Sequence, residues 1–291
     1  MIAQFLLNGV VTGAGYMLMA LGFALIYNTT RVFHLAHGTI ALISSYILFL
    51  VTVKLGLGLL PGVLFAVVTA AILGGAAEFS FYRALRRRGA GPNTFAVGSF
   101  GLFLVLQGLA GALFGTDVKV VRSGVLPTLN LFGLSVAQLH VWIIAVCVVA
   151  YPVLQLFLQR TRLGRQIRAV ANSQDLAVVL GVNVEQIRVL VFAVGSGLTG
   201  LAMALIVLDI GVSPSYAWTI ILASATAVVI GGVGYLPGAA VGGLVIGLAQ
   251  NIWAWQLPGS WPNTAVFLTL FAILLVLPRG LFGRGLTRRE A

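Results

Sequence analysis

Long apolar segments alternate with short polar ones along almost the whole chain. A helix that crosses a bilayer needs about 20 mostly apolar residues, and most of these segments approach or exceed that length. Their apolar residues are continuous rather than alternating, which favours helices over the strands of a membrane barrel. We predict an all-α polytopic integral membrane protein with about nine transmembrane helices, within a range of eight to ten and some of them broken. The predicted spans are Phe5–Tyr27, Ala36–Val53, Leu57–Phe79, Thr94–Gly115, Leu139–Leu158, Val189–Asp209, Ala217–Gly232, Ala239–Trp255 and Thr264–Leu277.

Composition supports this fold class and excludes several others. Of the 291 residues, 60% are hydrophobic and only 8% are charged, whereas soluble domains carry about 25% charged residues. The single Cys147 excludes an intrachain disulfide. Lys54 and Lys119 each follow a valine, so the chain lacks the Gly-Lys pair of a nucleotide-binding P-loop. We find no Ser/His/Asp set, carboxylate pair or metal cluster, and therefore expect neither an enzyme nor a cofactor.

The distribution of basic residues predicts the orientation. If the N-terminus lies outside, fourteen of the seventeen Lys and Arg residues fall in loops on one side of the membrane, and Lys54, Lys119 and Arg122 fall on the other. The fourteen-residue side is predicted to be the cytoplasm, which places the C-terminus there too. The basic residues lie between apolar segments, so they indicate membrane topology rather than nucleic-acid binding.

The loops are too short to form a second domain. The two longest lie near 116–138 outside and 159–188 inside, and neither reaches the ~50 residues of a small domain. We predict one transmembrane domain over residues 1–291, powered by a partner. Glycines at small-xxx-small spacing, such as Gly9/Gly13 and Gly243/Gly247, predict close helix packing.

Two polar stretches are candidates for function within the membrane. His34 and His37 lie in the segment Ile26–Gly38, where no cysteine or acid completes a metal site, so no metal is expected and a hydrogen-bonding role is favoured. In Ser224–Gly247, glycines and a proline interrupt two helices. Ser224 and Thr226 could face a cavity there or hydrogen-bond to their own helix. Glu78 and Asp209 lie near span ends and are interpreted as boundary residues that reach water.

The loop at 159–188 is predicted to contain a short amphipathic helix. Asn172, Ser173 or Asp175 could cap a helix that runs to about Leu180 and stops at Gly181. Leu176, Val179 and Leu180 would then share an apolar face. From the residues alone, this face could equally lie on the membrane or dock in a groove of another protein.

Four stretches in sequence order resemble the LivH-type permeases of branched-chain amino acid ABC importers. They are GYMLMALGFALIYNTTRVFHLAHG, RTRLGRQIRAVANSQDLAVVLGVNVEQI, TAVVIGGVGYLPGAAVGGLVIGL and LVLPRGLFGR. The resemblance covers nearly the whole chain. It implies a bacterial inner-membrane permease that carries a small polar solute, most simply a branched-chain or other amino acid, while a separate subunit hydrolyses ATP.

The resemblance also implies partners and sites. Partners would be ATP-binding subunits, a sibling permease forming a homodimer or heterodimer, a periplasmic binding protein, the solute and membrane lipid. The loop at about 159–188 would couple the permease to the ATPase, and the pathway would be lined from the two polar stretches. The implied coupling residues are Gly164, Arg168, Ala169, Asp175, Leu180 and Gly181, and the implied pathway residues are His37, Gly38, Thr39, Ser224 and Thr226.

Three positions depart from the family pattern. Thr39, Ala223 and Gln250 stand where the family often has Glu, Lys and an acid. We therefore hypothesise a substrate less charged or less amino-acid-like than leucine, such as urea, an amide or a small carboxylate, or a pathway whose charged half belongs to the sibling. A secondary transporter or channel is the main alternative, but it would need buried ionisable residues for ion coupling. A purely structural membrane subunit is the third possibility.

Overall fold

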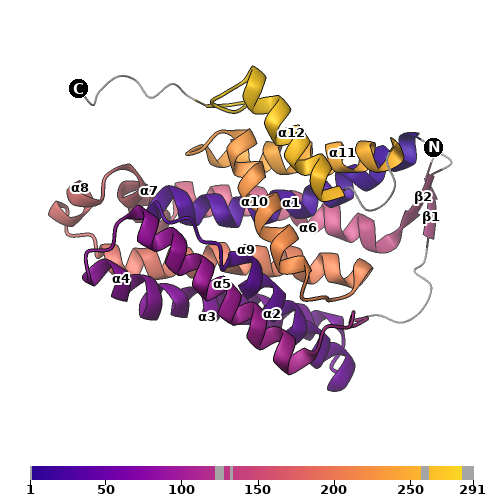
Figure 1. Cartoon of the computed structure of the whole chain (residues 1–291), viewed down its shortest axis with the longest axis horizontal. Coiled ribbons are helices and arrows are strands. Elements are labelled where there is room, and N and C mark those ends of the chain that lie inside the picture. The colour runs from indigo at the N-terminus through magenta and orange to yellow at the C-terminus, as the bar shows by residue number, and fades with distance from the viewer. Residues whose placement is uncertain (1, 122–127, 132–133, 257–261, 284–291) are drawn as a thin grey trace.

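The computed structural model describes residues 2–121, 128–131, 134–256 and 262–283. These residues form a helical bundle with one small hairpin (Figure 1). The elements in chain order are α1 (Ile2–Thr30), α2 (His37–Phe49), η1 (Leu50–Lys54), α3 (Leu59–Ala76), η2 (Ala77–Tyr82), α4 (Arg83–Arg87), α5 (Pro92–Phe114), β1 (Thr128–Leu131), β2 (Leu134–Ala137), α6 (Gln138–Arg160), α7 (Arg162–Asn172), α8 (Gln174–Val179), α9 (Val184–Ile210), α10 (Tyr216–Gly231), α11 (Leu236–Gln256) and α12 (Pro262–Val276).

The predicted spans coincide one for one with helices in the described part of the chain. Seven helices there are long and apolar enough to cross a membrane, and Tyr216–Gly231 and Val266–Val276 are shorter apolar helices. The π-helical turns η1 and η2 continue α2 and α3 without a break, so η2 and α4 extend the third span to Arg87. The all-α membrane fold predicted from the apolar pattern is therefore confirmed.

The helix α1 lies at the centre of the bundle. It contacts α6, α9, α10 and α11, and it is apolar on all sides, as a fully surrounded helix must be. Its contact with α11 is a backbone contact: a Cβ built on Gly247 would lie 2.2 Å from the Cα of Gly13. Its contact with α9 is similar, since a Cβ on Gly22 would lie 2.3 Å from the carbonyl oxygen of Gly195. The close packing predicted from the glycine spacing is confirmed here.

The two ends of the bundle carry different structures. The β1–β2 hairpin lies beside the start of α1, where the Gln4 side-chain amide donates to the carbonyl oxygen of Ser135 at 3.0 Å. The helices α4, α7 and α8 lie at the opposite end (Figure 1). The hairpin is an addition to the sequence prediction, because the pairing of two four-residue strands leaves little trace in an otherwise apolar pattern.

The glycine-rich break between α10 and α11 is narrower than the sequence suggests. The non-helical residues are Gly232 to Tyr235, where Gly232 and Gly234 have φ of +98° and +95°. Ser224 and Thr226 lie inside α10, within regular helix. The interruption is confined to one tight turn because these glycines can adopt a positive φ without steric cost.

The contact between α1 and α11 leads to a stability prediction. We expect Gly247→Ala to destabilise the chain by about 1–3 kcal/mol, because its methyl group would overlap the α1 backbone. Gly108→Ala on α5 is the matched control, since nothing lies within 4 Å of a Cβ at that position. Thermal unfolding in detergent, followed by tryptophan fluorescence, measures both. Equal midpoints for the two variants would contradict the central role of this contact.

Candidate functional site

The most distinctive polar structure is the connection between α6 and α9. Thr161 caps α7 by accepting a hydrogen bond from the Gly164 amide at 2.9 Å, and Ser173 caps α8 by accepting one from the Leu176 amide at 3.3 Å. Gly181 has φ +78° and ends the segment. Of the three predicted caps for α8, Ser173 is therefore correct, and the predicted stop at Gly181 is confirmed.

The helix α7 lies against the bundle. Gly164, Ile167 and Val170 are buried, while Arg162, Arg165 and Arg168 are exposed. Gly164 is required for this placement, since a Cβ there would lie 2.3 Å from the carbonyl oxygen of Phe157 in α6. The result is a helix with one side packed and a row of three guanidinium groups on the other.

The helix α8 protrudes at the end of the bundle (Figure 1). Most of its apolar side chains are exposed. Leu176, Val179 and Leu180 are 63%, 82% and 77% exposed, whereas Ala177 is buried. The predicted apolar face thus exists and points away from the protein. Asp175 and Gly181 are also exposed, and Ala169 is half-buried.

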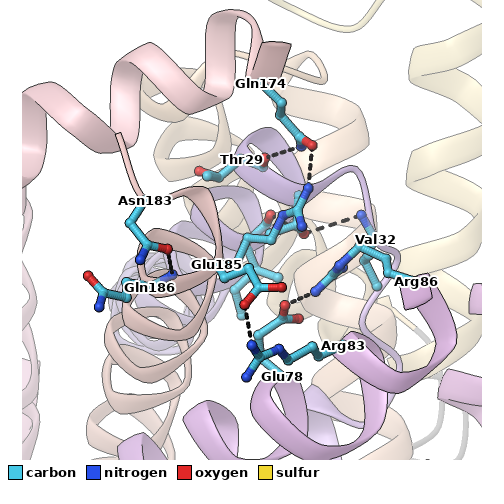
Figure 2. A network of polar contacts seen from close by, with 12 residues as sticks. Thr29, Val32, Glu78, Arg83, Arg86, Gln174, Asn183, Glu185 and Gln186 are labelled. Carbon is cyan, nitrogen blue, oxygen red and sulfur yellow. Dashed lines mark hydrogen bonds and ion pairs between the residues drawn. The ribbon is translucent and has the colours of Figure 1, made fainter. Parts of the chain in front are cut away.

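A polar network holds α8 and the start of α9 to the rest of the bundle (Figure 2). The side-chain amide of Gln174 donates to the carbonyl oxygen of Thr29, the penultimate residue of α1, at 3.2 Å. The Gln174 amide oxygen accepts from the Arg188 guanidinium. Arg83 forms an ion pair with Glu185 nearby. These contacts join the ends of α1, α4, α8 and α9.

The structure corrects the interpretation of Glu78. It was expected to reach water at a span end, but it lies in η2, is 2% exposed and forms an ion pair with Arg86. The helix continues past it to Arg87, so the boundary lies later than the apolar pattern indicated. Asp209 agrees with the prediction, because it lies in the last turn of α9 and is exposed. Its Oδ2 lies 3.2 Å from Nε2 of His140.

The two histidines of the first polar stretch are fully buried and face different partners. Nδ1 of His34 lies 2.8 Å from the Tyr82 hydroxyl, which donates to Oγ of Ser99 at 2.7 Å. Burial, with a smaller effect from His37, lowers the pKa of His34 well below its usual value, so the ring is neutral. His37 Nε2 contacts the hydroxyl of Thr199 on α9. The expected hydrogen-bonding role for these histidines is confirmed.

The remaining pathway candidates lie in packed helices. Thr39 donates to the carbonyl oxygen of Ala36 at 2.9 Å, and Ser224 donates to that of Ile220 at 2.7 Å. Gly38 packs against α10, where its Cβ would lie 2.2 Å from the carbonyl oxygen of Ala217. Thr226 is buried. Their role in a pathway stays a prediction.

Sequence reasoning missed the residues that form the network in Figure 2. Arg83, Gln174 and Arg188 read as ordinary loop and span-end residues because their partners lie far away in sequence. Tyr82 and Ser99 were missed for the same reason. Among the described residues, no group of three or more His, Cys, Asp or Glu side chains could hold a metal ion.

A bundle of long apolar helices with a short helix protruding at one end defines a polytopic membrane protein, the class to which permeases belong. The family model for the permease component of branched-chain amino acid transport systems matches residues 5–277. The chain belongs to this family.

Individual relatives agree with the family match. The high-affinity branched-chain amino acid transport system permease protein BraD of Pseudomonas aeruginosa is 30% identical over 97% of this chain and 95% of its own length. The corresponding LivH protein of Escherichia coli is 29% identical, with the same coverage. A probable LivH protein of Methanocaldococcus jannaschii is 26% identical over 92% of this chain and 88% of its own.

One solved structure resembles the fold. A chain in the structure of PsaBC from Streptococcus pneumoniae in complex with a Fab aligns with a TM-score of 0.51, covering 94% of this chain and 90% of that one. The sequences are 12% identical, so this likeness concerns the fold alone.

The burial of Glu78 leads to the second prediction. Glu78→Gln should destabilise the chain by about 1–3 kcal/mol, because it leaves the charge of Arg86, whose side chain is only 20% exposed, without its partner. Glu185→Gln removes the same charge from a half-exposed pair with Arg83 and should cost less than about 1 kcal/mol. Thermal unfolding of both variants in detergent provides the comparison, and a larger loss for Glu185→Gln would refute this ranking.

Proposed function

We propose that this chain is the transmembrane permease subunit of an ABC importer for a small polar solute, with ATP hydrolysis on a separate subunit. The observation that carries this proposal is the exposed apolar surface of α8. Leu176 and Val179 project from a six-residue helix at the end of the bundle, and Leu180 directly follows that helix. A contiguous exposed apolar patch is a mark of an interaction site. The patch is anchored at the start of α8, where Gln174 contacts Thr29 and Arg188. This anchoring favours docking into a partner's groove.

The proposed coupling segment spans about residues 159–188. In it, Asp175 offers a charge on α8 and Arg168 an exposed charge on α7, Leu180 contributes to the patch, and Gly181 permits the turn into α9. Gly164 and Ala169 act by seating α7 on the bundle. When the ATP-binding subunits close, their movement would reach α1 and α9 through the contacts of Gln174. The energy of binding would then shift the permease from one of its two stable states to the other.

The proposed orientation places α4, α7 and α8 in the cytoplasm. Fourteen of the seventeen basic residues belong to the loops at this end by the alternation of spans, and the excess of Lys and Arg is a cytoplasmic feature. The N-terminus and the β1–β2 hairpin then lie outside, where a periplasmic binding protein would deliver the solute. The location is the bacterial inner membrane, with the C-terminus inside.

The proposed second permease would cover α5. Of an 18-residue apolar stretch of this helix, only 17% is buried within the chain. Gly101 and Gly108 have nothing within 4 Å of an added Cβ, and small residues of this kind permit close contact between membrane helices. The partner would be a sibling permease or a second copy of this chain.

The docking proposal leads to the third prediction. Val179→Asp combined with Leu180→Asp should abolish co-purification with the ATP-binding subunits, because it places two charges in the apolar contact. Val118→Asp with Val120→Asp is the matched control, since both valines are exposed near the opposite end of the bundle. Both variants should insert and fold as the parent does. Unchanged association of the α8 variant would count against docking through this helix.

Substrate class gives the fourth prediction. With its partners in vesicles, the chain should support saturable, ATP-dependent uptake of leucine that valine and isoleucine inhibit. The sequence similarity to BraD and LivH supports branched-chain amino acids. The uncharged Thr39, Ala223 and Gln250 favour the second candidate, a permease for urea, amides or small carboxylates. Uptake of those solutes without competition by leucine would favour this second candidate. Accumulation of solute by the chain alone, driven only by an ion gradient, would refute the assignment to an ABC importer.

A further inference from the structure

A cavity of about 550 Å³ lies where η2 and α4 meet the start of α9. Its polar wall contains three arginines and two glutamates, which leave one net positive charge: Arg83, Arg86, Arg188, Glu78 and Glu185. Two of the arginines are matched by the glutamates in ion pairs. Arg188 donates to the neutral amide of Gln174, and within the described chain no carboxylate forms a direct ion pair with it. Glu185, which is already paired with Arg83, acts on Arg188 only from a longer distance. The cavity wall therefore keeps one positive charge in excess, and Arg188 is the arginine without a direct ion pair.

Several buried polar atoms of this cavity have no hydrogen-bond partner in the protein. They are Nε of Arg83, Nε of Arg188 and Oε2 of Glu78, together with Nη2 of Arg86, which lies in the ion pair with Glu78. Buried donors and acceptors of charged groups are costly to leave unsatisfied, which makes each of them evidence for a missing partner. Apart from Nη2 of Arg86, these are two donors and one acceptor, and a ligand that both accepts and donates hydrogen bonds would satisfy them once the side chains turn toward the cavity.

An apolar groove continues from this cavity along the outside of the bundle. It is lined by Ala71, Ile72, Gly75 and Ala76 of α3, and it shares Phe79, Val189 and Ala193 with the cavity. Ile72 and Phe79 are 63% and 60% exposed, so the groove faces the surroundings of the bundle. In a membrane-spanning chain, this surface meets lipid acyl chains.

We propose that the cavity and groove together bind one anionic phospholipid with a hydroxylated head group, such as phosphatidylglycerol. The phosphate accepts hydrogen bonds from Arg188 and Arg83 and neutralises the excess charge. A head-group hydroxyl donates to Oε2 of Glu78, and an acyl chain lies in the groove beside Ala76. Basic pockets between membrane helices suit anionic head groups, whereas a choline head group offers no donor for Glu78 and no net charge.

The position of this lipid connects it to α8. Arg188 holds Gln174, and Gln174 holds the end of α1 (Figure 2). A phosphate on Arg188 would fix the guanidinium orientation on which both contacts depend. The bound lipid therefore braces the base of α8, and this role does not depend on which solute the permease carries.

Native mass spectrometry of the full-length chain, purified in detergent and given equal amounts of phosphatidylglycerol and phosphatidylcholine, tests the proposal. We expect retention of one phosphatidylglycerol with about fivefold preference, consistent with the contribution of one arginine near a lipid phosphate. Arg188→Gln should abolish the preference. The matched control Arg87→Gln should keep it, because Arg87 is exposed on α4 and does not line the cavity.

A second variant tests the groove and does not depend on the charged residues. Ala76→Phe fills the groove from an exposed position and should reduce retention of the lipid, while Val68→Phe on the same helix should not. Equal retention of the two lipids by the parent chain would overturn the proposal. So would loss of the preference in Arg87→Gln, or equal binding of phosphatidylethanolamine.

Discussion

The backbone contacts of α1 are the constraint on which the rest of the structure depends. In lipid, apolar side chains gain little by leaving one apolar surroundings for another, so membrane helices associate through close packing and polar contacts. Gly13 meets Gly247 on one side of α1 and Gly22 meets Gly195 on the other. Of an 18-residue apolar stretch of α1, 89% is buried inside the bundle, whereas the corresponding share for α5 is only 17%. The glycines of α1 thus define the centre of the bundle, and α5 remains available at its periphery.

The polar network adds direction to this framework. It is concentrated where α1 ends and where α4, α8 and α9 begin, and Gln174 is its junction because one side chain contacts both Thr29 and Arg188. A displacement of α8 would therefore move the end of α1 and the start of α9 together. Rigid helices would pass this displacement along their length, so the coupling would need no continuous polar path through the interior of the bundle. The proposed lipid site lies at the same junction.

Local chemistry explains what the sequence could predict and what it could not. The spans, the Ser173 cap and the Gly181 stop depend on neighbouring residues, and all are present. Glu78 was misjudged because its burial depends on Arg86 and on a helix that continues as a π-helical turn. The contact between His34 and Tyr82 joins residues 48 positions apart, and that between His37 and Thr199 joins residues 162 apart. Such pairings depend on the helix arrangement, which no local pattern contains.

The packing of the predicted pathway residues indicates which movement transport would require. His37 and Gly38 lie in the interface of α2 with α9 and α10, where Gly38 packs closely against the backbone of Ala217, and Ser224 is buried in α10. A solute could reach them only if α2 and α10 separated. The hydrogen bonds of Thr39 and Ser224 are made within their own helices and would survive this separation, whereas the contact between His37 and Thr199 would open. Such a movement would break few polar contacts and could restore the interface at Gly38 afterwards. Alternating access would require a movement of this kind, because the permease must pass repeatedly between two states.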